Sequence, residues 1–219
     1  MKLSLIDYLV CPSCRSRLIL KTKSKIKNEI IEGTLICSKC KDKFQIHRGI
    51  PRFVVDITKD FVRTEMAFSE KWKNHHKNHH AKDWIEWQKK WFLNRFDWKS
   101  LKIFNEFLKS KNFILDAGTG IGNSAKMLSV NKSSTVFALD ASDSIDFAYK
   151  KYGKSKNIHF IQADIRQLPF KKSFFDYIFS DQVLHHTKKY FNIFQISYKI
   201  SSERWTYLDI CLQQESSCA

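Results

Sequence analysis

The sequence is poor in residues that bend or break a chain, with 6 glycines and 3 prolines among 219 residues. It also lacks an apolar run of the roughly 18 residues that a membrane-spanning helix needs. The first residues, MKLSLIDYLVC, form too short an apolar run for a signal peptide because Asp7 interrupts it. We therefore expect a cytoplasmic protein without a membrane span, whose reduced cysteines favour metal binding over disulfides.

Arginine is scarce as well. The net charge of +16 comes from 38 basic residues against 22 acidic ones, but only 8 of the 38 are arginine. Arginine is the side chain that reads phosphates and bases with two parallel hydrogen bonds, whereas lysine acts as a point charge. Abundant Lys, Ile, Asn and Phe are typical of AT-rich codon usage. RNA is thus a possible partner but not the favoured one. With 43% apolar residues the chain can fill a core, as one large domain or a large domain with a small satellite.

The sequence contains two CxxC pairs, Cys11 with Cys14 and Cys37 with Cys40. A CxxC turn directs both thiolates at one ion, so two pairs predict a tetrahedral structural zinc site. The stretches LILKTKSKI and EIIEGTLIC between the pairs are expected to form two paired strands. A redox role is the alternative, but redox motifs are usually a single pair at a strand–helix junction. His47 is a spare donor, expected at the surface or in packing.

The run YLVCPSC…GTLICSKCKDKFQIHRGIPRF resembles the small zinc-ribbon proteins that bind and activate tRNA and protein methyltransferases. It also resembles the same ribbon fused in front of methyltransferase domains. The resemblance implies that residues 1–55 are a β-rich structural or docking module, with a possible protein partner.

Residues 56–100 form an aromatic connector. Trp84, Trp87 and Trp91 recur at helical spacing, which predicts a helix that packs its apolar face on a neighbour or covers a substrate pocket as a lid. The run HHKNHH places histidines at i, i+4, a spacing that can hold a metal ion. No cysteine or carboxylate accompanies them, so a solvated connector is the preferred interpretation.

The stretch KNFILDAGTGIGN predicts a buried strand over Phe113–Asp116, a turn with Gly118, Gly120 and Gly122, and a helix from near Asn123. Glycines let the backbone approach a ligand closely, and a helix N-terminus then faces that ligand. A glycine turn alone is weak evidence of a nucleotide site.

Two carboxylates make the prediction more specific. Asp116 stands directly before the turn, where it would repel a pyrophosphate but attract an ammonium group. Asp140 ends the second strand, TVFALD, and can accept hydrogen bonds from both hydroxyls of a ribose. A ligand with an ammonium group and a ribose is S-adenosylmethionine (SAM). A nucleotide-dependent dehydrogenase is disfavoured.

Two more strands follow. IHFIQADIRQLPF is expected to end at Asp164, and FFDYIFSDQVLHHT starts near Asp176 and ends in Ser180, Asp181 and Gln182. Alternating strands and helices predict an α/β fold with a doubly wound parallel sheet that binds its ligand at the carboxyl ends of the strands.

LDAGTGIGN, ALDAS, ADIRQLPF and FDYIFSDQVLHHT resemble the motifs of class I SAM-dependent methyltransferases, over about residues 100–190. The resemblance implies a Rossmann-like fold over residues 101–199 and SAM as methyl donor to an unidentified acceptor, with a small molecule or glycolipid precursor favoured over RNA. It also implies cofactor contacts by Asp116, Gly118, Thr119, Gly120, Gly122, Asp140, Ala141, Asp164, Ile165, Asp181 and Gln182.

Methyl transfer from SAM depends mainly on orientation, because the cofactor already carries the activated group. A general base is needed only for a protonated acceptor. Asp181 and His185 are the candidate catalytic residues, with His186 as a further candidate base.

Residues 200–219 depart from the family pattern. No glycine follows Gly153, so the Gly-Gly turn expected after the fourth strand is missing, although WTYLDIC could form a fifth strand. Advancing the reading frame by one base after Lys199 permits the text KFPPKGGHIWIYVYNKSPPV, which restores that turn. We hypothesise that this tail is a frameshifted, truncated end that impairs activity. The alternatives are a natural short variant, and a non-catalytic docking module with a remnant methyltransferase half.

Overall fold

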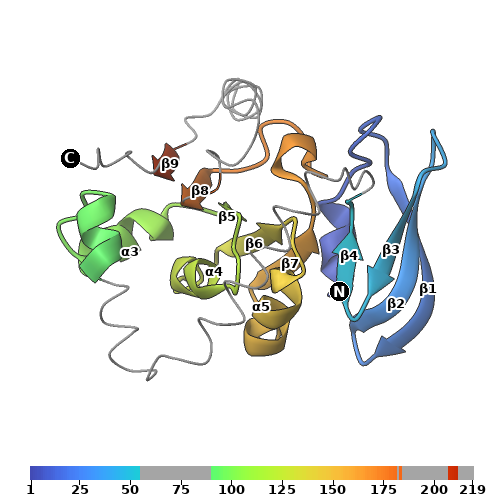
Figure 1. Ribbon diagram of the computed structural model, residues 1–219, viewed down its shortest axis with the longest axis horizontal. Helices are drawn as coiled ribbons and strands as arrows, with labels where there is room; N and C mark the ends of the chain where they lie inside the picture. The colour runs from blue at the N-terminus through green and yellow to red at the C-terminus, as the bar shows by residue number, and fades with distance from the viewer. Residues whose placement is uncertain (55–89, 182, 184–206, 212–219) are drawn as a thin grey trace, which may run out of the picture.

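The structure, a computed structural model, describes residues 1–54, 90–181 and 183, together with the backbone of residues 207–211 (Figure 1). The strands are β1 (Leu18–Ile26), β2 (Glu29–Cys37), β3 (Lys43–His47), β4 (Ile50–Arg52), β5 (Phe113–Ala117), β6 (Thr135–Asp140), β7 (Ile158–Gln162), β8 (Tyr177–Asp181) and β9 (Tyr207–Cys211). The helices are η1 (Leu3–Asp7), α3 (Leu101–Lys109), α4 (Asn123–Leu128), α5 (Ser144–Tyr152) and η2 (Ile165–Gln167), of which η1 and η2 are 3-10 helices.

The strands form a mixed sheet in the order β1-β2-β3-β4-β7-β6-β5-β8-β9. Strands β1 to β4 pair antiparallel, and β7, β6, β5, β8 and β9 pair parallel. Numbered along the chain, the parallel part has the order 3-2-1-4-5, which is that of a doubly wound nucleotide-binding sheet. The predicted α/β fold is confirmed. The order reverses at β5, so the ligand crevice is expected where β5 and β8 end.

Most strand positions agree with the sequence pattern. β1 and β2 are the two stretches expected between the cysteine pairs, and β9 lies within WTYLDIC. β7 ends at Gln162, two residues before Asp164, because the chain turns into η2 there. The rest of the tail lies outside the described residues, so the frameshift stays a prediction.

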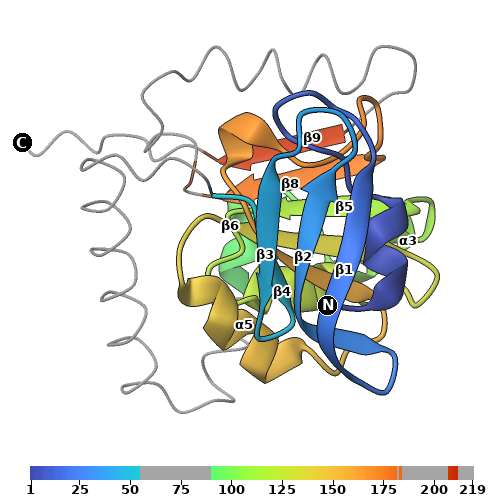
Figure 2. The same cartoon turned by 90° about the vertical axis from the view of Figure 1, so that its right-hand side faces the viewer.

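Side chains alternate between the two faces of the parallel strands. Ile114, Val136 and Tyr177 pack on one face with residues of α3, α4 and α5. Leu115 and Phe137 lie in the other cluster, together with ribbon residues that include Met1, Leu5, Leu9, Leu35 and Phe44. Figure 2 shows β1 to β3 lying across the parallel strands on that side. The N-terminal segment therefore covers one face of the sheet and shares its core.

Backbone pairing joins the same two parts. β4 pairs with β7 in parallel through Arg52 and Gln162, and the amide of Phe53 donates to the carbonyl of Gln162 at 2.7 Å. The amide of Val10 donates to the carbonyl of Pro169 at 2.9 Å. One sheet therefore runs continuously from the ribbon into the parallel strands.

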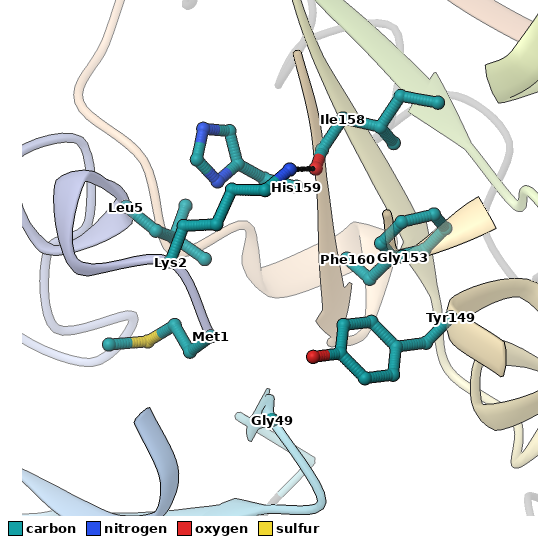
Figure 3. Close-up of a pocket in the computed structure, with 9 residues that line it drawn as sticks. All are labelled: Met1, Lys2, Leu5, Gly49, Tyr149, Gly153, Ile158, His159 and Phe160. Atoms are coloured by element: carbon teal, nitrogen blue, oxygen red, sulfur yellow. Dashed lines mark hydrogen bonds between the residues drawn. The ribbon is translucent and has the colours of Figure 1, made fainter. Parts of the chain in front are cut away.

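A small pocket lies at this junction (Figure 3). The Met1 ammonium donates to the carbonyl of Ile30 at 2.6 Å, and burial lowers its pKa to about 6. Lys2 Nζ donates to the carbonyl of Ile158 at 2.5 Å. Beside it, burial lowers the pKa of His159 to about 3, so this histidine is neutral. The junction thus holds buried polar groups as well as apolar ones. Among the described residues, no helix is long and apolar enough to cross a membrane.

Candidate zinc and cofactor sites

The four cysteines of the ribbon converge on one point. Cys11 and Cys14 come from the loop before β1, Cys37 ends β2, and Cys40 lies in the turn before β3. Their Sγ atoms all lie within 4.8 Å of one another, and three of the pairs are 3.3 to 3.6 Å apart. Zinc–sulfur bonds of about 2.3 Å in a tetrahedron place the sulfurs about 3.8 Å apart. The donor set therefore fits a closed zinc site made of four thiolates. His47 is exposed and pairs with Glu32 at 3.2 Å, outside this cluster.

The glycine turn after β5 has the backbone that the sequence predicts. Gly118, Gly120 and Gly122 have φ angles of +88°, +54° and +84°, a region that L side chains rarely adopt. A Cβ atom on Gly118 would lie 2.1 Å from Cγ2 of Val183, which follows β8. The turn therefore lies directly against the chain that leaves β8, at the reversal point of the sheet.

Asp116 is buried beneath this turn, with 1% of its surface exposed. Its Oδ2 accepts hydrogen bonds from Thr119 Oγ1 at 2.5 Å and from Ser124 Oγ at 2.7 Å. Burial raises the pKa of this carboxyl to about 7, although both hydroxyl bonds favour the charged form. The side chain links the strand end to the turn and to the start of α4, and its protonation state changes near neutral pH.

Asp140 holds the turn from the neighbouring strand. Its Oδ2 accepts from the amide of Gly120 at 2.7 Å, and its Oδ1 accepts from the amide and hydroxyl of Ser142 at 2.9 and 2.6 Å. Ala141 follows, and its carbonyl accepts from Gln162 Nε2 at 3.0 Å. The structure thus brings Asp140 and the glycine turn together.

Asp164 and Ile165 lie at the start of η2, beyond the end of β7. The Asp164 carboxylate accepts from the amide of Arg166 at 2.8 Å and forms an ion pair with the Arg166 guanidinium. Sequence reasoning did not include Arg166. The Asp164 carboxylate is therefore occupied by a neighbour two residues along the chain.

Asp181, the last residue of β8, pairs with an arginine that the sequence analysis missed. Arg95 Nε donates to Asp181 Oδ1 at 3.1 Å. Burial raises the pKa of Asp181, and the Arg95 charge opposes that shift. The two residues are 86 positions apart, and no periodicity links them.

The other predicted positions lie outside the described residues. They are Gln182, His185, His186, the histidine run His75–His80, and the tryptophans Trp84 and Trp87. Of the three tryptophans at helical spacing, Trp91 is described, and the aromatic residues Phe92 and Phe96 that follow it both pack on Phe179 of β8. These contacts bury part of the connector against β8, and whether the connector packs as a helix or covers a pocket as a lid stays a prediction.

Comparison with known proteins agrees with the two resemblances. Residues 115–200 match the family described as a methyltransferase domain. Residues 2–49 match the family described as Trm112p-like protein. The chain therefore combines a segment similar to a methyltransferase domain with one similar to Trm112p-like proteins, as the sequence motifs predicted.

A curated relative is the ubiquinone/menaquinone biosynthesis C-methyltransferase UbiE of Wigglesworthia glossinidia brevipalpis, which is 34% identical over 85 residues. The match covers 36% of this chain, and it spans about a third (34%) of the relative's length.

Solved structures include a SAM-dependent methyltransferase from Aquifex aeolicus, with 21% identity, a TM-score of 0.46, and coverage of 60% of this chain and 72% of that one. A second structure is a chain from the complex between the Haloferax volcanii Trm112 methyltransferase activator and a methyltransferase. It has 38% identity and a TM-score of 0.25, and the match covers 25% of this chain and 93% of that one.

Proposed function

We propose that the chain is a SAM-dependent methyltransferase. The observation that carries this proposal is that Asp116 and Asp140 lie on either side of one glycine turn, at the point where the strand order reverses. Open α/β sheets bind their ligands at that point. The domain match over residues 115–200 supports the same activity.

In this proposal Asp116 and the turn from Gly118 to Gly122 hold the methionine part of SAM. Asp140 and Ala141 hold the ribose, and Asp164 and Ile165 flank the adenine. Since Asp140 already accepts from Ser142 and Gly120, it is aligned before any ligand binds. Such preorganisation lowers the entropy lost on binding.

The bound cofactor supplies an electrophilic methyl group. The residues of this chain then have to orient the two reactants and exclude water. By the family resemblance, Asp181 and Gln182 line the proposed transfer site, and Asp181 or His185 can take a proton if the acceptor carries one.

We favour a small-molecule acceptor over RNA. The curated relative is a C-methyltransferase of ubiquinone and menaquinone biosynthesis, and the chain is poor in arginine. RNA binding would show a steep dependence on salt, because bound phosphates release counterions. A salt titration with a labelled RNA therefore tests the alternative.

We further propose that the partner of the Trm112p-like ribbon is the chain's own methyltransferase domain. β4 already pairs with β7, and the ribbon residues share a core with Leu115, Phe137 and Ile178. A ribbon that docked a different protein through this surface would have to expose that core. The contacts favour a structural role within the same chain over a separate docking module. Zinc bound by Cys11, Cys14, Cys37 and Cys40 would stabilise the ribbon.

The decisive experiment is calorimetric titration of the full chain with S-adenosylhomocysteine (SAH) and with SAM. We expect Asp140→Asn to weaken the binding of SAH and of SAM by about 10- to 100-fold, since a hydrogen bond to a charged group contributes roughly 1.5–3 kcal/mol. Asp143→Asn, at an exposed position three residues away, is the matched control and should bind normally. If the wild-type chain binds neither compound, the proposed function is wrong.

A further inference from the structure

Arg95 has a buried hydrogen-bond donor that the described structure does not use. Its Nη2 atom is buried and has no partner among the described residues. Buried polar groups in folded proteins are nearly always paired, so an unpaired guanidinium nitrogen requires an explanation. The guanidinium is charged at every physiological pH and offers five N–H groups, of which one is known to contact Asp181.

Aromatic packing fixes the position of this arginine. Arg95 ends the helical residues 90–95, and Phe92 and Phe96 on either side of it pack on Phe179 with ring centroids 5.7 and 5.0 Å away. Phe179 and Asp181 are two residues apart on β8, so they lie on the same face of the sheet. The apolar contacts therefore place the guanidinium beside Asp181.

The contacts of the guanidinium also limit its freedom. Nε is bonded to Asp181 Oδ1 at 3.1 Å, and Cζ lies 5.0 Å from the centre of the Trp91 ring. A carboxylate partner and an aromatic face hold the planar group in one orientation. An arginine that served only to neutralise Asp181 could use both of its facing nitrogens, but here Nη2 stays unpaired.

The end of β8, which Arg95 contacts, lies against the glycine turn of the proposed SAM site. Ser180 Oγ donates to the carbonyl of Ala117 at 3.0 Å, which ties the end of β8 to the start of the glycine turn. Val183, two residues beyond Asp181, contacts Gly118. Arg95 thus borders the proposed SAM site on the side of β8, opposite the ribose residue Asp140 on β6.

We propose that Arg95 is a specificity-determining residue that binds a carboxylate of the methyl acceptor through its free Nη2 group. This inference rests on the proposed function and narrows the acceptor to small molecules that carry a planar anionic oxygen group. A guanidinium matches a carboxylate in geometry as well as charge, and such charge-assisted bonds are about twice as strong as neutral ones. Because the ion pair with Arg95 engages its carboxylate, Asp181 acts here as a positioning residue that holds the guanidinium, and His185 is left as the candidate base.

Benzoate and benzamide test this proposal, since they have nearly the same shape and differ in charge. Each is titrated into the full chain, with and without saturating SAH. We expect wild-type protein to bind benzoate about tenfold more tightly than benzamide, and Arg95→Met to bring that ratio near one. Arg95→Lys keeps the charge beside Asp181 but loses the planar fork, so it should retain the melting temperature and lose most of the preference.

Lys109→Met is the control for lost positive charge, because Lys109 is exposed on α3 and pairs with Glu106. It should leave the ratio unchanged. The proposal is overturned if wild-type protein shows no preference for benzoate, or if Arg95→Met keeps the preference. A purely structural Arg95 would change stability and SAH affinity without changing the ratio. Failure of SAH to bind the wild-type chain would instead reject the proposed function.

Discussion

Arg52 of β4 forms a two-bond ion pair with Asp146 of α5. Nη2 donates to Oδ1 at 2.8 Å and Nη1 to Oδ2 at 3.0 Å, and Nη1 also donates to Gln162 Oε1 at 3.0 Å. One side chain of the ribbon thus contacts both a strand and a helix of the methyltransferase domain. Since the two parts also share a core, the pair lies at the edge of an extensive internal interface.

Arg52→Met should therefore destabilise the whole protein and not the ribbon alone. Bonds to charged groups contribute roughly 1.5–3 kcal/mol, but both side chains are partly exposed, so we expect about 1–2 kcal/mol. That corresponds to a fall of very roughly 2–8 °C in melting temperature for a chain of this length. Lys43→Met removes the same charge from an exposed position of β3 and is the control. Equal melting temperatures for the two variants would contradict the prediction.

Removal of zinc should have a similarly wide effect. A closed site of four thiolates contributes folding free energy directly, and the ribbon covers the face of the sheet that holds Leu115 and Phe137. We expect one zinc ion per chain by elemental analysis, and a single unfolding transition that moves to lower temperature in a chelator. Cys37→Ser should behave like chelated wild-type protein. Two separate transitions, with the upper one insensitive to chelator, would show that the ribbon folds independently.

The sequence predicted the elements whose signals are local. Glycine spacing after Phe113 located the turn with positive φ, and the alternating stretches between the cysteine pairs located β1 and β2. The cluster of four cysteines was also predictable, because CxxC turns have little freedom. Asp116 and Asp140 could be identified from the sequence because each ends a parallel strand. In open α/β sheets the ligand binds at the carboxyl ends of the strands.

The relation between the two parts of the chain was not predictable in the same way. The ribbon was expected as a structural or docking module, and the sequence did not show that β4 would extend the sheet or that Leu5 and Leu9 would pack against it. An apolar residue shows that it needs burial but not which partner buries it. Arg95 was missed for the same reason, since its partner is 86 residues away. The domain boundaries at residues 55, 100 and 199 stay predictions.

Gly118→Ala should disable the proposed cofactor site. The residue has φ of +88°, and a Cβ atom would lie 2.1 Å from Val183 Cγ2, so both the backbone and the chain after β8 must move. We expect SAH affinity to fall at least about tenfold, with roughly 1–3 kcal/mol lost in stability from the strained backbone. The double variant Gly118→Ala with Val183→Ala should recover part of the affinity by relieving the clash. Normal SAH binding by the single variant would argue against a ligand at this turn.

Asp116 should make the stability of the protein depend on pH. Its folded-state pKa is raised from 3.8 to about 7, so the folded protein holds a proton that the unfolded chain has already lost. The contribution of Asp116 to the free energy of unfolding is fully present below about pH 4 and is lost as the pH rises through about 7. One pKa unit corresponds to about 1.4 kcal/mol, which sets an upper limit of roughly 4 kcal/mol. Asp116→Asn should lack this pH-dependent loss of stability. In urea unfolding, the free energy of unfolding of the variant should therefore increase relative to that of wild type between about pH 5 and pH 8.

The same titration should govern binding of SAM. An ammonium group pairs with the carboxylate and not with the carboxylic acid, so binding requires Asp116 to release its proton. Below pH 7 affinity should therefore rise with pH, by up to about tenfold per unit, and level off once the carboxyl is ionised. Calorimetry in buffers of different ionisation enthalpy should detect one proton released on binding near pH 6. Asp116→Asn should bind weakly and without this pH dependence. A wild-type affinity that stays constant from about pH 5 to pH 7 would mean that the ammonium is held elsewhere, and that Asp116 serves only to fasten Thr119 and Ser124 beneath the turn.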